Sequence, residues 1–133
     1  MLLAAIAAVF VADLFAPWTR SCVEVQGILA PFCHDSHGWS GLAGLAGVLA
    51  VIVLIWQLLT KVRGREPRPA RDRMVVAVLS LAALTLTITE VLLDIHVLVW
   101  GAWAGLGLAV ALAVVAIAQL RAVMASPEVD ASD

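Results

Sequence analysis

Residues 61–73 read Lys61-Val62-Arg63-Gly64-Arg65-Glu66-Pro67-Arg68-Pro69-Ala70-Arg71-Asp72-Arg73, and this stretch decides how the rest of the chain is arranged. It holds six of the eight basic residues, and long apolar segments lie on both sides of it. Short loops rich in lysine and arginine stay on the cytoplasmic side of a membrane. Two prolines and one glycine disfavour a continuous helix across the stretch. The sequence therefore predicts a basic inner loop, residues 61–73, between two membrane-spanning segments.

The composition indicates a membrane protein. Of the 133 residues, 63% are hydrophobic and 14% are charged, whereas soluble domains carry about 25% charged residues. A helix needs about 20 apolar residues to cross a bilayer, so the length accommodates four spans. The five tryptophans lie mostly near segment ends. This placement is typical of side chains that anchor helices at the membrane surface.

Four apolar segments are predicted to be spans, at about 1–17, 41–60, 74–93 and 97–120. With the basic loop inside, both termini are cytoplasmic, and seven of the eight basic residues lie on that side. Residues 19–40 then form the first outer loop, and residues 122–133 form a short acidic cytoplasmic tail. The predicted fold is all-α: a four-helix transmembrane bundle that makes one domain over residues 1–121.

Both cysteines, Cys22 and Cys33, fall in the first outer loop. A disulfide persists in the oxidising environment outside the cell. Closing a loop of about a dozen residues stabilises the folded chain by roughly 3 kcal/mol in the chain-entropy model. We therefore expect a disulfide that closes this loop. Thiol redox chemistry is not expected, because the pair is not Cys-x-x-Cys and the chain holds no further thiol.

Acidic and histidine side chains gather at the outer level of the predicted bundle. Histidine and carboxylate groups are usual ligands of zinc and related metals. Neighbouring buried carboxylates raise one another's pKa, as a proton carrier requires. The candidate metal ligands are His34, His37, Glu90, Asp94 and His96. The candidate cation or proton site comprises Asp13, Glu90 and Asp94.

A structural interpretation competes with both of these sites. A charged group at the level of the lipid headgroups has a small free-energy cost, so several of these acids need have no function. Arg20 could also form an ion pair with one of them. The histidines His34 and His37 are spaced as His-x-x-His in a loop, which is a weak metal signal. A metal ion is therefore a hypothesis, and no other cofactor is predicted.

Two helix faces are predicted to point into the bundle. The segment at 74–93 carries small and polar residues at helical spacing, and ionisable groups avoid lipid. They are Ser80, Ala83, Thr87, Glu90 and Asp94. The segment at 97–120 has a small residue at every fourth position, which lets backbones approach closely. This small face is Gly101, Gly105, Ala109 and Ala113, and we expect it to form the tightest helix contact.

The basic loop itself is a third candidate site. Clustered lysine and arginine residues next to a span attract anionic lipid headgroups. The alternative is that the cluster only sets the topology. The basic side chains are Lys61, Arg63, Arg65, Arg68, Arg71 and Arg73. Nucleic-acid binding is not expected, because the loop lies against the membrane and contains no aromatic residues.

The stretch Leu14-Phe15-Ala16-Pro17-Trp18, followed by Gly38-Trp39 before a span rich in glycine and alanine, resembles uncharacterised small four-span membrane proteins of actinobacteria. The likeness covers about the first half of the chain. The composition, heavy in alanine, valine, leucine and arginine, suits a high-GC genome. The resemblance points to a bacterial plasma membrane and implies no activity.

The sequence contains no glycine-rich phosphate loop, no arguable Ser-His-Asp arrangement and no pair of mid-span histidines for haem. We therefore predict a protein that is not an enzyme. The favoured function is a non-catalytic accessory subunit of a larger membrane complex or a homo-oligomer, with membrane lipids and a membrane protein as partners. The alternative is an outward-facing metal, cation or proton site in a small transporter or channel.

Overall fold

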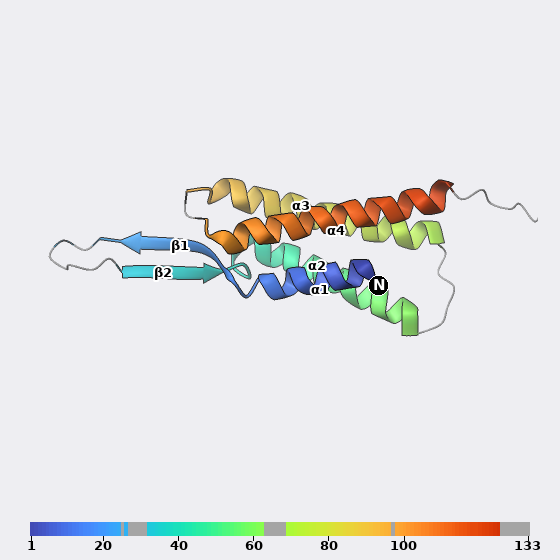
Figure 1. Cartoon of the computed structure of the whole chain (residues 1–133), viewed down its shortest axis with the longest axis horizontal. Helices are drawn as coiled ribbons and strands as arrows, with labels where there is room; N and C mark the ends of the chain where they lie inside the picture. Colours follow the sequence, from blue (N-terminus) through green and yellow to red (C-terminus); the bar gives the residue numbers. More distant parts are fainter. Residues whose placement is uncertain (25, 27–31, 63–68, 97, 126–133) are drawn as a thin grey trace, which may run out of the picture.

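The computed structural model describes residues 1–24, 26, 32–62, 69–96 and 98–125. The elements follow in the order α1 (Leu2–Asp13), β1 (Pro17–Val23), β2 (Phe32–His37), α2 (Gly41–Val62), α3 (Pro69–Leu93) and α4 (Trp100–Ala125). Figure 1 shows the helices side by side, with an antiparallel β1–β2 hairpin that projects from one end. We name this the hairpin end. The basic end is the opposite one, where α2 ends and α3 begins.

Three helices are long and apolar enough to cross a membrane, within the part of the chain that the structure describes. They are Gly41–Val62, Ala70–Leu93 and Trp100–Ala125. The helix α1 is apolar but has only 12 residues, about 18 Å against the roughly 30 Å of a bilayer core. The chain thus has the helices of a membrane protein, and the first segment, predicted as a span at about 1–17, is helical only over Leu2–Asp13.

The proline at position 17 explains why α1 ends early. A proline ring clashes with the carbonyl four residues before it, and proline has no N–H to donate. That carbonyl belongs to Asp13, the last residue of α1. It accepts the N–H of Ala16 at 2.9 Å and the indole N–H of Trp18 at 3.2 Å instead. The chain therefore leaves the helix at Asp13 and continues as an extended strand.

The first outer loop contains two paired strands, so the all-α prediction is wrong for Pro17–Val23 and Phe32–His37. In the register of the two strands, Cys22 lies opposite Cys33 and their disulfide is formed, as expected. The pairing shifts by one residue at the base of β1, where Trp18 is the extra residue. Such a bulge re-aims a side chain, and the Trp18 side chain is buried among the helices.

The predicted boundaries also shift at the basic end. Proline is favoured in the first turn of a helix, and α3 accordingly begins at Pro69 rather than Met74. Lys61 and Val62 belong to α2, so the loop between the helices is shorter than the predicted 61–73. The helix α4 begins at Trp100, not at residue 97, and extends to Ala125, into the predicted tail. Arg63, Arg65, Arg68 and residues 126–133 lie outside the described residues.

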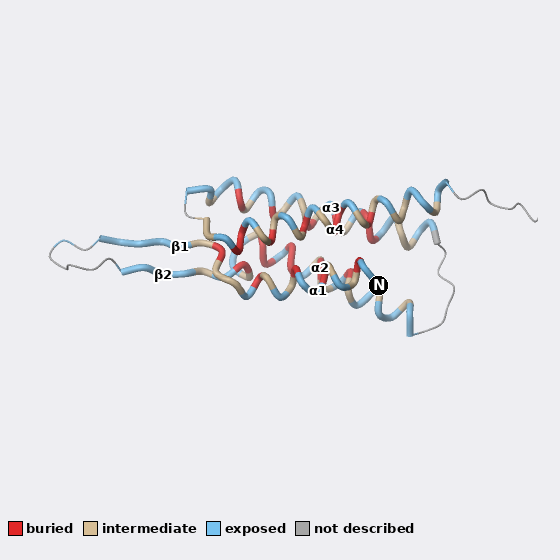
Figure 2. Tube along the Cα trace, viewed as in Figure 1, coloured by how far each residue is buried: buried red, intermediate tan, exposed pale blue. Residues whose placement is uncertain are grey.

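The helices pack in a ring in which α1 contacts α2 and α4, and α3 contacts the same two helices. Figure 2 shows the buried positions along the inside of this ring and the exposed hairpin beyond it. The polar face of α3 points inward as predicted, because Ser80 and Thr87 are fully buried. Their hydroxyls donate to the carbonyls of Val76 and Ala83 in the same helix. These two hydroxyls are therefore satisfied without a partner from another helix.

Candidate functional site

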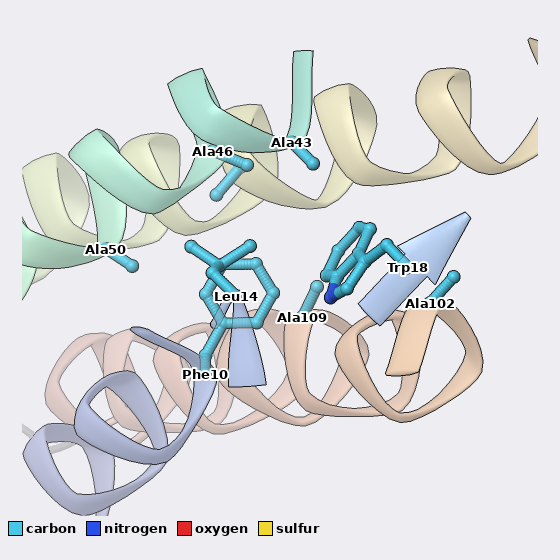
Figure 3. Close-up of a cluster of buried hydrophobic side chains, with 9 residues drawn as sticks. Phe10, Leu14, Trp18, Ala43, Ala46, Ala50, Ala102 and Ala109 are labelled. Carbon is cyan, nitrogen blue, oxygen red and sulfur yellow. The ribbon is translucent and has the colours of Figure 1, made fainter. Parts of the chain in front are cut away.

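At the hairpin end, Trp18 is tightly packed. Its side chain is only 2% exposed, so the prediction of an anchor at the membrane surface is wrong for this tryptophan. Figure 3 shows the indole between Ala43 of α2 on one side and Ala102 and Ala109 of α4 on the other. A Cβ built on Gly38 would lie 2.6 Å from the Trp18 ring, closer than real contacts allow. The ring therefore holds the hairpin base and the helices together.

The small face of α4 receives this tryptophan. A Cβ at Gly105 would overlap the Trp18 ring and lie 2.8 Å from Asp13 Oδ2. A Cβ at Gly101 would overlap the carbonyl oxygen of Pro17. Both glycines, with Ala109 and Ala113, are buried as the spacing predicted. At Gly101 and Gly105, the segment that approaches α4 closely is therefore the connection between α1 and β1.

Backbone hydrogen bonds fix the same connection to α4. The carbonyl of Trp18 accepts the N–H of Val99 at 2.8 Å, and Thr19 forms an isolated bridge with Leu98. Non-helical backbone at membrane depth is tolerated where protein covers it and its polar groups are paired. The extended segment thus continues from α1 with backbone groups paired to the residues that precede α4.

Glu90 is half-buried near the start of α2, and its carboxylate makes a contact with that helix. Its Oε2 accepts the backbone N–H of Leu42, in the first turn of α2, at 3.0 Å. A helix leaves its first N–H groups without partners and has a positive dipole end there. The helix α2 has no acidic residue of its own in that turn. Glu90 is therefore a cap supplied by another helix, which the sequence analysis missed.

The geometry of this cap requires glycine at position 41. Gly41 has a φ of +69°, a conformation that residues with a Cβ rarely adopt. A Cβ there would also overlap Glu90 Oε1. In the sequence, the only sign of this cap is that the first turn of α2 has no acidic residue. That absence does not indicate which distant carboxylate accepts the N–H groups of the turn.

Asp13 is placed differently from Glu90. Its Oδ2 atom is buried and has no hydrogen-bond partner among the described residues. It faces Gly105 of α4 beside the Trp18 ring. A buried polar atom without a partner costs free energy, about 1–3 kcal/mol. No hydrogen bond from the described residues therefore compensates for the burial of the Asp13 Oδ2 atom.

The candidate metal ligands do not come together. His34 and His37 are exposed on β2, His96 is exposed beyond α3, and Asp94 is half-buried near the end of α3. In the described part of the chain, no three histidine, cysteine or acidic side chains lie close enough to hold a metal ion. The proposed metal site has no counterpart in these residues.

The hairpin carries its own ion pair. The Arg20 guanidinium donates to both carboxylate oxygens of Asp35, at 2.7 and 3.2 Å. This hydrogen bonding holds the pKa of the Asp35 carboxyl below its usual value. Both side chains are exposed, and such surface pairs contribute little to stability. Arg20 does pair with an acid, but the acid is Asp35, across the hairpin.

At the basic end the helices leave two clefts. One, of about 340 Å³, lies between α1 and α2 and is lined by residues that include Lys61. The other, of about 100 Å³, lies between α2, α3 and α4 and is lined by residues that include Arg73. The Arg73 guanidinium contacts the Gln119 side chain of α4. Two members of the predicted basic cluster, Lys61 and Arg73, thus line cavities.

Comparisons with models of protein families, with curated proteins and with solved structures find no match to this chain.

Proposed function

We propose that this protein is a non-catalytic accessory or structural subunit, of a larger membrane complex or of a homo-oligomer, and that its hairpin contacts the partner. The observation that carries the proposal is the hairpin itself. It projects beyond the helices and is closed by the Cys22–Cys33 disulfide. Beyond that disulfide, Val23 and Phe32 lie opposite each other and are 63% and 66% exposed. A disulfide-closed projection with exposed apolar side chains suits contact with another protein.

The outer edge of β2 also supports partner binding. The base of β1 is joined to Leu98 and Val99 on its outer edge. Among the described residues no strand pairs with the other edge of β2. An open edge presents unpaired N–H and C=O groups and accepts a further strand. We propose that a strand or loop of the partner pairs there.

The uses of the ionisable side chains support a structural role over transport. Glu90 caps α2, Asp35 pairs with Arg20, and Arg73 contacts Gln119. These groups connect parts of the fold. The small face of α4 no longer supports a neighbour, because Gly101 and Gly105 are covered by the chain's own residues. The case for a partner therefore rests on the hairpin.

We further propose that the basic end faces the cytoplasm of a bacterial cell and that the hairpin lies outside. Lysine and arginine next to spans favour the cytoplasmic side. The disulfide favours an oxidising compartment for the hairpin. Both arguments assign the same orientation, although they rest on different residues at opposite ends of the helices.

The test compares two surface variants with the parent chain, each purified from native membranes in a mild detergent. We expect the parent to carry a stoichiometric partner or to run as an oligomer. The double variant Val23→Ser/Phe32→Ser should lose that association and keep its helices, as measured by circular dichroism. Ile95→Ser is the matched control, because Ile95 is exposed at the same end but lies outside the hairpin.

A parent chain that purifies as a partner-free monomer would overturn the subunit proposal. Equal loss of association in the hairpin variant and in Ile95→Ser would overturn the role of the hairpin while leaving a subunit. Labelling of Cys22 and Cys33 in intact cells after mild reduction, with an impermeant reagent, tests the orientation separately.

A second candidate function is an outward-facing cation or proton site, and one observation favours it. The buried Oδ2 of Asp13 has no partner among the described residues, and ionisable groups inside a membrane are functional candidates. This function predicts proton or cation flux in liposomes that Asp13→Asn abolishes. Asp94→Asn is the control, and absence of flux in the parent chain would exclude the candidate.

A further inference from the structure

We propose that the cleft between α1 and α2 at the basic end binds an anionic phospholipid, with the lipid phosphate at Lys61. The cleft has a volume of about 340 Å³, which is within the usual range for a small-molecule site. Its lining is divided by chemistry. Met1, Ala4 and Leu58 supply apolar surface, and Gln57, Thr60 and Lys61 supply polar groups.

The charged group of the cleft, Lys61, lies at the end of α2 with Met1 beside it, and Ala4, Gln57 and Leu58 lie deeper. Lys61 is in the last turn of α2 and is exposed. Leu58 lies one turn further into the helix, on the side where Ala4 of α1 completes the wall. A phospholipid has the same order, with a charged headgroup at the surface and an acyl chain below it. The cleft matches that order in two respects: its charged side chain, Lys61, is at the end, and the apolar Leu58 and Ala4 are deeper.

The Lys61 ammonium lacks a strong acceptor in the described structure. Its one described contact is the thioether sulfur of Met1, at 3.9 Å, and such a sulfur is a weak acceptor. An ammonium group has three donors. The amide of Gln57, in the same cleft, has no described hydrogen-bond partner for its side chain. Both groups are therefore free to donate to phosphate oxygens.

The neighbouring cleft, between α2, α3 and α4, is a poorer site for an anion. It is smaller, at about 100 Å³, and its lining includes the carboxylate of Asp72. Its cation, Arg73, already contacts Gln119. None of the described residues that line the α1–α2 cleft is acidic. Charge and volume thus select the Lys61 side.

The wider charge of the basic end favours an anionic lipid over a zwitterionic one. Besides Lys61 and Arg73, the described residues there include Arg71 and Arg121, and Asp72 is the one described acid. Lysine and arginine near a membrane surface each attract anionic lipid by about 1 kcal/mol. This attraction does not depend on any one binding site. The experiment therefore has to distinguish binding in the cleft from general attraction to the basic residues.

The experiment is native mass spectrometry of the purified chain in an uncharged detergent, titrated with phosphatidylglycerol. We expect one lipid to stay bound to the parent chain. Lys61→Gln should weaken that binding about tenfold or more, because it removes a charged donor. Ala4→Leu should weaken it similarly by filling the cleft. Arg121→Gln removes the same charge at the same end without lining the cleft, and should change the affinity less than twofold.

Three results would overturn the proposal. One is equal weakening by Lys61→Gln and Arg121→Gln, which would indicate diffuse attraction only. Another is unchanged affinity in Ala4→Leu, and the third is equal binding of phosphatidylcholine. Circular dichroism of each variant checks that the helices are intact. Because the measurement uses the isolated chain, it stands or fails independently of the subunit proposal.

Discussion

At the hairpin end of this protein the elements interlock, whereas at the basic end the helices separate. Trp18 fills the space beside Gly38 and Gly105, and Glu90 of α3 caps α2. At the basic end, two clefts open beside α2. Among the described residues there, the side-chain hydrogen bonds between helices are those of Arg73 with Gln119 and of Lys61 with Met1. Core alanines dominate the first region, and larger aliphatic side chains such as Leu3, Val53 and Leu112 the second.

The difference shows where each end can tolerate change. Where side chains leave no space between them, an added atom must displace its neighbours, because protein interiors are close-packed. Open clefts absorb added atoms or admit a ligand. We therefore expect the fold to depend on the hairpin end and ligand exchange to belong to the basic end. The following variants test this comparison.

The largest effect is expected for Gly105→Leu. Even a Cβ at this position overlaps the Trp18 ring, and overpacking a buried site costs about 1–3 kcal/mol or more. A whole leucine side chain should displace Trp18 and prevent a stable fold. The yield of monodisperse protein and its thermal unfolding in detergent measure this.

Gly107→Leu is the matched control, two residues further along α4. No atom of the described residues lies within 4 Å of a Cβ at Gly107. Leucine also favours helix more than glycine does, by close to 1 kcal/mol. We expect normal yield and equal or higher stability. Similar damage from both substitutions would remove the distinction between a filled and an open face of α4.

An intermediate effect is expected for Glu90→Ala. It leaves the N–H of Leu42 without its acceptor, at a cost of about 1–3 kcal/mol. Glu90→Gln keeps an acceptor oxygen and should lose less. Asp94→Ala, one turn further along α3, removes a carboxylate with no described side-chain partner and should change the unfolding free energy little. If Asp94→Ala destabilises as much as Glu90→Ala, the capping role is wrong.

The smallest effect on the helices is expected from reducing the disulfide. Cys22 and Cys33 lie beyond Trp18 and Thr19, the hairpin residues that join α4 and its preceding loop. Reduction should loosen the distal hairpin, by roughly 3 kcal/mol in the chain-entropy model, and leave helix unfolding unchanged. Trypsin reports this, because Arg20 is the one lysine or arginine between residues 18 and 60. Cleavage there should accelerate about tenfold or more.

Cys22→Ser/Cys33→Ser should show the same fast cleavage without reductant. A reduced chain that is cleaved at Arg20 no faster than the oxidised one would mean that strand pairing alone orders the hairpin. A fall in the thermal stability of the helices on reduction would mean that the hairpin and the helices unfold together.

Much of the fold follows from local sequence. The apolar runs behind α2, α3 and α4 are long enough to be recognised without any structure, because helix length must match bilayer thickness. The cysteine pair in a loop predicts its own disulfide. The inward faces of α3 and α4 follow from helical spacing, and Ser80, Thr87 and Gly105 are indeed buried. The roles of the candidate site residues could not be predicted in the same way. Glu90, for example, has a clear role only once its contact with the N–H of Leu42 is known.

By itself, then, the sequence determined the apolar helices, the disulfide and the concentration of basic residues at one end, because hydropathy, redox environment and charge act on each segment separately. Tertiary structure decided the rest. The first segment runs from the level of Lys61 to that of Gly101 as a short helix and an extended strand. Trp18 turns inward at a bulge because glycines from two distant segments leave it room, and Glu90 becomes a cap because α2 begins beside it. Each depends on contacts between residues far apart in the chain, which no local pattern specifies.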